Sequence, residues 1–169
     1  MTETTLTRDE IFEILDEVKD PEVPVLSVVE LGIIRDVQID EGAVTITITP
    51  TYSGCPAMRV IEEDITAALA ARGVEPVRLR TVYAPAWTTD WLTNEAKAKL
   101  EAYGIAPPGP AGQESLVSLT RATPVAERAR CPYCQSRDTR IESEFGSTAC
   151  KAIAYCNSCK QPFELFKAL

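Results

Sequence analysis

Histidine is absent from the 169 residues of this chain. Its absence excludes Ser-His and Cys-His nucleophile pairs, imidazole metal ligands and the usual general base near neutral pH. Catalysis would have to use carboxylates, lysine, tyrosine, cysteine or a bound cofactor. The sequence also has no Gly-rich phosphate loop. We therefore expect a protein that is not an independent enzyme.

Long apolar runs are also absent. No segment approaches the length needed to cross a bilayer, and residues 1–20 lack the apolar core of a signal peptide. We therefore expect a cytoplasmic protein with no membrane partner, in which thiols stay reduced. Six cysteines in such a compartment favour metal ligation or redox chemistry over disulfides.

Positive charge is scarce in the first part of the chain. Residues 1–120 contain 9 Lys and Arg against 20 Asp and Glu, whereas residues 121–169 contain 8 against 5. The net charge is −8, and an acidic body repels polyphosphate, so we expect no nucleic-acid partner. The weakly basic end is either a docking surface for an acidic protein or an ordinary solvated surface.

Helical and strand patterns alternate up to residue 103. A capping box at Thr7–Glu10 predicts where the first helix begins. The expected elements are a helix over 8–19, a β-hairpin over 33–48, a helix from 56 to before 73, a strand over 77–81 and a helix over 91–103. The order α-β-β-α-β-α predicts an α+β fold with helices on one side of a mixed sheet.

Composition then divides the chain into three segments. We expect an α+β domain over residues 1–103, a linker rich in proline and glycine over 104–130, and a β appendage of the zinc-ribbon kind over 131–169. Leu116 and Val117 could form a short strand within the linker.

Two CxxC pairs lie in the last segment. They are Cys131-Pro-Tyr-Cys134 and Cys156-Asn-Ser-Cys159, and 21 residues separate them. Two thiolates on a tight turn can bind one ion at about 2.3 Å, and two such turns complete a tetrahedron. A domain of this size with few large apolar side chains needs a bound metal or a similar crosslink to stabilise its fold. We predict that these four cysteines bind a metal, with zinc favoured.

Cys150 keeps an iron–sulfur cluster open as an alternative. It lies six residues before Cys156, so it could serve as an extra ligand, replace one of the four, or remain buried without binding metal.

Cys55 is a second candidate site. It follows a strand and precedes Pro56, so it should lie at the N-terminal cap of the second helix. The unpaired N–H groups there would lower the pKa of the thiol and make it a soft metal ligand or a nucleophile. The alternative is a small residue packed at the cap. If the fold brings Asp20, Glu22 and Glu30 close, a mixed sulfur–oxygen site would form.

Three motifs resemble the small domain shared by SufT and its relatives in iron–sulfur assembly, over roughly residues 7–83. They are Asp20-Pro-Glu-Val-Pro-Val, Glu30-Leu-Gly-Ile-Ile and Thr51-Tyr-Ser-Gly-Cys55-Pro. Three further motifs resemble the PaaD family of phenylacetate-degradation proteins and extend the likeness over nearly the whole chain. These are Pro85-Ala-Trp-Thr-Thr-Asp-Trp91, Gly104-Ile-Ala-Pro-Pro and Phe145-Gly-Ser-Thr-Ala-Cys-Lys151.

The resemblance implies a role in aerobic phenylacetate breakdown, where a multicomponent oxygenase epoxidises phenylacetyl-CoA. The family is expected to help mature this epoxidase by serving its iron–sulfur or iron centres, with the epoxidase subunits or their reductase as partners. Cys55 would handle iron or a transient cluster, with Asp20 and Glu22 in the accompanying acidic motif. Glu30 stands where relatives often have aspartate, which preserves the carboxylate.

Two alternatives remain. The chain could be a non-catalytic structural subunit of the oxygenase, with Trp87, Trp91 and Phe166 as candidate contacts. It could instead be an iron–sulfur electron carrier that uses the C-terminal cysteines.

Overall fold

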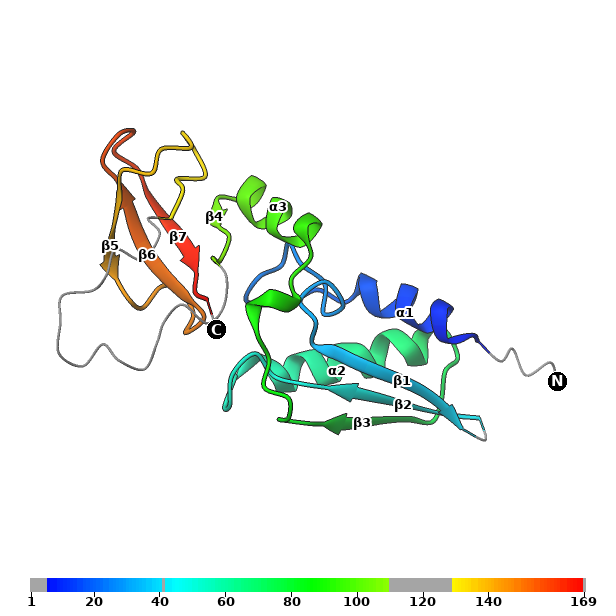
Figure 1. Cartoon of the computed structure of the whole chain (residues 1–169). Helices are drawn as coiled ribbons and strands as arrows, with labels where there is room; N and C mark the ends of the chain where they lie inside the picture. Colours follow the sequence, from blue (N-terminus) through cyan, green and yellow to red (C-terminus); the bar gives the residue numbers. More distant parts are fainter. Residues whose placement is uncertain (1–5, 41, 110–128, 169) are drawn as a thin grey trace. The chain divides into compact units, whose positions relative to one another are not determined.

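The chain forms two compact units. The computed structural model describes residues 6–40, 42–109 and 129–168, and the chain divides into residues 1–87 and 88–169 (Figure 1). We expected the first domain to extend to residue 103. The helix that ends at that point lies in the second unit, where it contacts the strand that follows it.

The first unit has the expected order of elements. They are α1 (Arg8–Glu17), β1 (Ile34–Asp40), β2 (Ala43–Ile48), α2 (Ala57–Ala71) and β3 (Val77–Thr81). The sheet order is β1-β2-β3, with β1 antiparallel and β3 parallel to β2. This mixed sheet confirms the predicted α+β fold.

Local signals explain where α1 begins. The Glu10 N–H donates to the Thr7 hydroxyl at 3.3 Å, and the Thr7 N–H donates to the Glu10 carboxylate at 2.7 Å, which completes the predicted capping box. The apolar stripe of the helix is buried at Ile11, Ile14 and Leu15. The helix ends at Glu17, two residues before the expected end.

One face of the sheet forms the core of this unit. Val44, Ile46 and Ile48 alternate along β2 and are buried, whereas the threonines between them lie on the opposite face. The buried side chains of α2 on the core side are Ile61, Ile65 and Leu69. Burial of each such side chain contributes about 1.5–3 kcal/mol. Helices α1 and α2 pack against each other and against the strands (Figure 1).

The second unit combines a helix with a four-stranded sheet. Its elements are η1 (Thr89–Trp91), α3 (Asn94–Tyr103), β4 (Ile105–Ala106), β5 (Thr139–Ser143), β6 (Lys151–Cys156) and β7 (Pro162–Phe166), and the sheet order is β4-β7-β6-β5. The helix begins three residues later than expected, because the Thr93 side chain caps it by accepting from the Ala96 N–H at 3.1 Å.

Part of the expected linker joins this sheet. Ile105 and Ala106 form β4, which pairs in parallel with β7. The suggested strand at Leu116 and Val117 lies outside the described residues. Two of the four CxxC cysteines belong to the small core of the unit, whose members are Ala106, Cys131, Ala154, Cys156 and Phe163. No helix among the described residues has the length and apolar character of a membrane span.

Candidate metal and cluster-handling sites

The two CxxC turns share one backbone geometry. In each turn the N–H of the first cysteine donates to the carbonyl five residues on, and the carbonyl of that cysteine accepts the N–H of the residue after the second cysteine. The bonds are Cys131 N–H to Ser136 O (2.9 Å), Gln135 N–H to Cys131 O (2.9 Å), Cys156 N–H to Gln161 O (3.0 Å) and Lys160 N–H to Cys156 O (3.0 Å). Gln135 and Lys160 both have positive φ, which turns the chain back after each second cysteine.

These turns bring the four sulfurs together. The Sγ atoms of Cys131 and Cys159 lie 3.7 Å apart, and those of Cys134 and Cys156 lie 3.5 Å apart. All four Sγ atoms lie within 4.8 Å of one another. A tetrahedral ion with sulfur ligands at about 2.3 Å places its ligands about 3.8 Å apart. The four cysteines therefore fit a single metal ion.

The pKa values of the clustered thiols also favour a bound cation. Backbone N–H groups of Cys159 and Ser158 lower the pKa of Cys156 to about 6. Burial raises the pKa of Cys159 to about 12, so in the absence of a cation one thiol ionises at the expense of its neighbour. A bound divalent cation would offset the negative charge and allow all four thiolates to form.

The first turn packs against α3 within the second unit. The Gln135 side chain donates to the Glu101 carboxylate at 2.7 Å. A side chain at Gly104 would meet the Tyr133 hydroxyl at 3.3 Å, so the glycine lets the tyrosine ring lie close. Gly104 also ends α3 at φ 93°, a conformation that favours glycine. These contacts join the first CxxC turn to α3.

Cys150 does not join the cluster. It immediately precedes β6, whereas Cys156 ends that strand, and a strand rises about 3.3 Å per residue. Its sulfur lies 3.1 Å from the Thr148 hydroxyl, and its side chain is buried. Cys150 is therefore not one of the cysteines whose sulfurs lie together in this structure.

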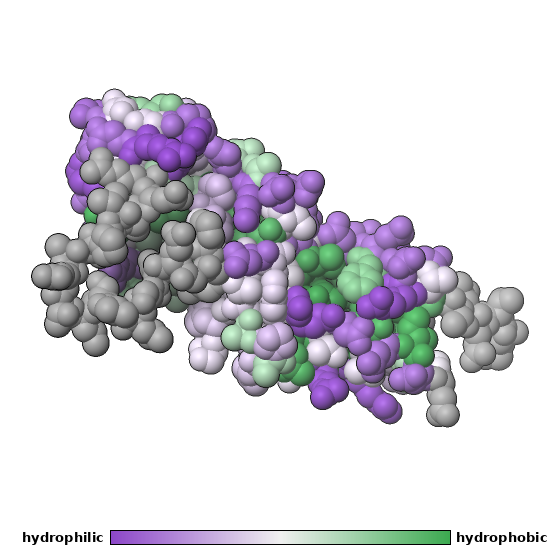
Figure 2. All heavy atoms as spheres, viewed as in Figure 1, coloured by the Kyte–Doolittle hydropathy of each residue, from purple (hydrophilic) through white to green (hydrophobic). Residues whose placement is uncertain are grey.

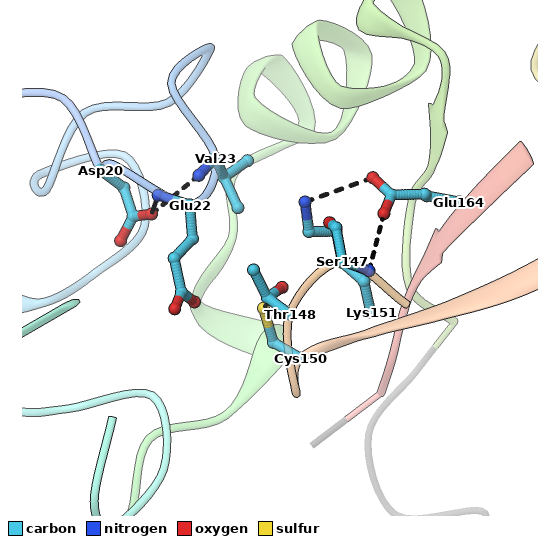
Figure 3. A network of polar contacts seen from close by, with 8 residues as sticks. All are labelled: Asp20, Glu22, Val23, Ser147, Thr148, Cys150, Lys151 and Glu164. Carbon is cyan, nitrogen blue, oxygen red and sulfur yellow. Dashed lines mark hydrogen bonds and ion pairs between the residues drawn. The ribbon is translucent and has the colours of Figure 1, made fainter. Parts of the chain in front are cut away.

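An ion pair that sequence reasoning missed lies beside Cys150. The Lys151 amine lies 3.2 Å from the Glu164 carboxylate, and the Ser147 N–H donates to the same carboxylate at 3.1 Å (Figure 3). The lysine side chain is only 5 % exposed. Thirteen residues separate the two charges, and no local spacing rule predicts their pairing.

Burial alone would raise the pKa of Glu164. The hydrogen bonds from Ser147 and the charge of Lys151 outweigh that effect and hold the pKa of this carboxyl below its usual value.

Cys55 lies at the entrance to α2, one residue before the position we expected. Pro56 is the N-cap and the helix begins at Ala57. The Cys55 N–H donates to the Tyr52 carbonyl at 3.3 Å, and the Cys55 carbonyl accepts from the Met58 N–H at 3.3 Å. These bonds hold the thiol at the turn between β2 and α2.

The expected direction of the Cys55 pKa was wrong. Burial raises the pKa of the thiol, and the negative charges of Glu22 and Asp20 raise it further. Hydrogen bonds from the Ala57 N–H and the Tyr52 hydroxyl act in the opposite direction but are too weak to reverse the shift. The helix N-terminus therefore contributes as expected, yet burial and the acidic surroundings prevail.

The two carboxylates of the acidic motif come close enough to Cys55 to act on its charge. Asp20 is only 6 % exposed, and one of its oxygens accepts the N–H groups of Glu22 at 2.7 Å and Val23 at 2.8 Å (Figure 3). These bonds fix the loop after α1. The structure thus places a thiol and two carboxylates in one region of the first unit, although 35 residues separate Asp20 from Cys55 in the sequence.

Glu30 has a different role. Its carboxylate accepts the Ser27 N–H at 2.9 Å, and its own N–H donates to the Ser27 hydroxyl at 3.0 Å. This reciprocal pair is a capping arrangement for the turn before β1. The negative charges that raise the pKa of Cys55 include those of Glu22 and Asp20.

Two of the aromatic residues suggested as contacts are core residues. Trp87 is 5 % exposed, and its indole N–H donates to the Leu31 carbonyl at 2.8 Å. Phe166 is 1 % exposed. Neither offers an accessible surface to a partner. The exposed aromatic side chains are Tyr83, Tyr103, Tyr133 and Phe145 instead.

Comparison with known proteins gives a consistent result. Residues 8–82 match the family described as iron-sulfur cluster assembly protein, and residues 117–167 match the PaaD zinc beta ribbon domain. The chain is 45 % identical over 161 residues to an Escherichia coli K12 protein that is provisionally named as one of the subunits of 1,2-phenylacetyl-CoA epoxidase. That match covers 95 % of this chain and 92 % of the relative. The chain belongs to the PaaD family.

Members of a second group resemble the first unit of this PaaD-family chain. An Fe-S protein maturation auxiliary factor of Porphyromonas gingivalis is 36 % identical and matches 56 % of this chain and 90 % of its own length. The crystal structure of a domain of unknown function from Bacillus anthracis has a TM-score of 0.52 at 30 % identity. The match covers 55 % of this chain and 90 % of the Bacillus anthracis chain.

Proposed function

We propose that this chain is a non-catalytic accessory protein that helps to assemble iron–sulfur or iron centres of a phenylacetyl-CoA epoxidase system. The observation that carries the proposal is that Glu22 and Asp20 lie near enough for their charges to act on the Cys55 thiol, in a unit that matches an iron–sulfur assembly family. The likeness to a protein named as an epoxidase subunit, over almost the whole chain, supports the choice of client. The clients would be the epoxidase subunits or their reductase.

The chemistry of the Cys55 site suits a transferred cargo. At neutral pH the raised pKa keeps the thiol protonated while the site is empty of cargo, and the two carboxylates supply negative charge beside it. Iron delivered as cargo would first bind the carboxylate oxygens, and the thiol would lose its proton when it binds the iron. A site that binds only with proton loss, and that is partly open to solvent, is suited to release as well as capture.

The four-cysteine cluster has a separate task in this proposal. Cys131, Cys134, Cys156 and Cys159 would hold one zinc ion that stabilises the second unit. The short sulfur–sulfur distances of 3.5 and 3.7 Å support a single ion. Cysteines that bind different iron atoms of a cluster must lie farther apart, whereas all four sulfurs here lie within 4.8 Å of one another. A closed tetrahedral site with four thiolates has no open position for a substrate.

The decisive experiment uses Cys55→Ala together with the client. The variant and wild type are each co-expressed with the epoxidase and reductase components, and the iron content of the purified clients is measured. Ser53→Ala, an exposed substitution in the same loop, is the matched control. The proposal expects under-metallated clients with Cys55→Ala and normal clients with Ser53→Ala. Full metallation with Cys55→Ala would refute it.

A structural role is the second candidate, because the E. coli relative is named as a subunit. A subunit would co-purify with the other components at fixed stoichiometry, whereas an assembly factor would associate transiently. An electron-carrier role would require a brown protein with visible absorption after anaerobic purification. A colourless protein with one zinc per chain would exclude that role.

A further inference from the structure

The first unit has an open strand edge. β3 lies at the end of the sheet order β1-β2-β3 and pairs only with β2 among the described strands. In a parallel pair, alternate residues direct their backbone groups toward the neighbouring strand. The bonds at the two ends of this pair, Val44 N–H to Pro76 O (3.0 Å) and Val82 N–H to Ile48 O (2.8 Å), determine which residues of β3 do so.

By this alternation, the backbone N–H and C=O groups of Arg78 and Arg80 point toward β2. Those of Val77, Leu79 and Thr81 point outward. Within the part of the chain that the structure describes, no backbone bond is made on the outward side by these three residues. We refer to Val77–Thr81 as the β3 edge. An open row of N–H and C=O groups is a template for a further strand.

Two arginines stand along this edge. Arg78 and Arg80 are exposed, and their register opposite Thr45 and Thr47 places them on the sheet face that does not contribute to the core. Neither has an ion pair or hydrogen bond with any side chain among the described residues. The other arginines of the unit have partners, among them Arg8 with Asp36, Arg59 with Glu63 and Arg72 with Glu17.

The surroundings favour recognition of a protein. The chain as a whole has a charge of −8, so two unpaired guanidinium groups on an exposed strand are exceptions to its acidic character. Tyr83, just beyond the strand, is 66 % exposed. Arginine and tyrosine are enriched among residues that dominate protein interfaces. Hydrophilic residues are prominent along the lower border of this unit in Figure 2, where Figure 1 shows β3.

We propose that the β3 edge binds an extended acidic segment of a partner protein, which adds to the sheet as a fourth strand. The backbone of the segment would bond the outward N–H and C=O groups of Val77, Leu79 and Thr81. Its carboxylates would lie beside Arg78 and Arg80. Side chains on one face of a strand are two residues apart, so the segment carries Asp or Glu at alternating positions. This inference does not depend on Cys55 or on the proposed function.

Peptide binding tests the charge requirement. A fluorescein-labelled peptide of alternating Glu and Thr residues is titrated with the full chain, and anisotropy is measured at low and physiological salt. We expect the double substitution Arg78→Gln and Arg80→Gln to weaken binding at least tenfold. Arg59→Gln, an exposed arginine on α2, should leave it unchanged. Equal binding by the double variant, equal binding of a Gln-Thr peptide, or no binding by wild type would overturn the proposal.

Amide exchange tests the added strand. Binding of the Glu-Thr peptide should slow hydrogen exchange at Val77, Leu79 and Thr81, while the amides of Arg78 and Arg80, already bonded to β2, should change little. Peptide binding without that alternation would overturn strand addition. Concentration-dependent self-association of wild type that is lost in the double variant would identify a second copy as the occupant and would also overturn the proposal.

Discussion

Glu22 lies close enough to Cys55 for the charge of its carboxylate to raise the pKa of the thiol, in addition to the larger effect of burial. The relationship joins two motifs from distant parts of the sequence. Together with burial, it keeps the thiol at the start of α2 protonated near neutral pH, against the lowering effect of the helix N-terminus.

Removing the charge of Glu22 should make Cys55 more reactive. Glu22→Gln removes a negative charge that opposes ionisation, so the thiolate fraction at about pH 7.5 should rise and alkylation by iodoacetamide should accelerate severalfold. The measurement is mass spectrometry of the Cys55 peptide over time. Glu63→Gln, an exposed carboxylate on α2, is the control. An unchanged rate in Glu22→Gln would show that the two groups do not interact.

The metal site should depend on four cysteines and not on the fifth. Cys131→Ser should lose the metal and the order of the second unit, because structural zinc binds with an apparent free energy of about 10–16 kcal/mol in small domains. Cys150→Ser should retain one metal per chain. Elemental analysis with far-UV circular dichroism measures both effects. Metal loss in Cys150→Ser would place that thiol among the ligands.

The ion pair of Lys151 and Glu164 should make stability depend on pH. The pKa of Glu164 in the folded state lies below the ordinary value of 4.5, so its contribution is fully present above that value and is lost as pH falls through the folded pKa. Glu164→Gln should therefore be less stable than wild type by about 1.5–3 kcal/mol near neutral pH. That difference should shrink as the pH falls below the ordinary value. Urea denaturation at each pH measures it, and a constant difference would contradict the assignment.

The buried indole of Trp87 should stabilise the first unit. Trp87→Phe removes the hydrogen bond to the Leu31 carbonyl and leaves that acceptor buried, at a cost of about 1–3 kcal/mol. Tyr83→Phe, at an exposed position in the same unit, should change stability by less than about 0.5 kcal/mol. Thermal unfolding, monitored by circular dichroism, measures the stability of both variants and of wild type. Equal stabilities would mean that the indole bond contributes nothing.

The most predictable features were those encoded by short-range patterns. Alternation around Val44 and Ile46 predicted the hairpin, because one face of β2 must be buried. The capping box at Thr7 predicted the start of α1. The spacing of the two CxxC pairs predicted the four-cysteine cluster, since each turn is a local structure that needs only one partner.

Features that depend on distant residues were predicted less well. The sign of the Cys55 pKa shift was wrong because burial and the charges of Asp20 and Glu22 reach the thiol through the tertiary fold, whereas local reasoning considered only the helix dipole. The Lys151–Glu164 ion pair was not predicted, because it too depends on the tertiary fold. Trp87 was a candidate contact residue although it is buried, because a loop aromatic has no periodicity that reveals its burial. The sequence identified Asp20 and Glu22 as residues that could join Cys55, but only the fold brings their charges to the thiol.

Under the proposed function, Cys55 acts in metal-centre assembly for an oxygenase client. The most direct test is the iron content of the epoxidase and reductase purified from cells that carry Cys55→Ala, with circular dichroism to verify that the variant is folded. We predict a folded variant that keeps its own zinc while its clients contain substoichiometric iron. Fully metallated clients in the presence of folded Cys55→Ala would contradict the account.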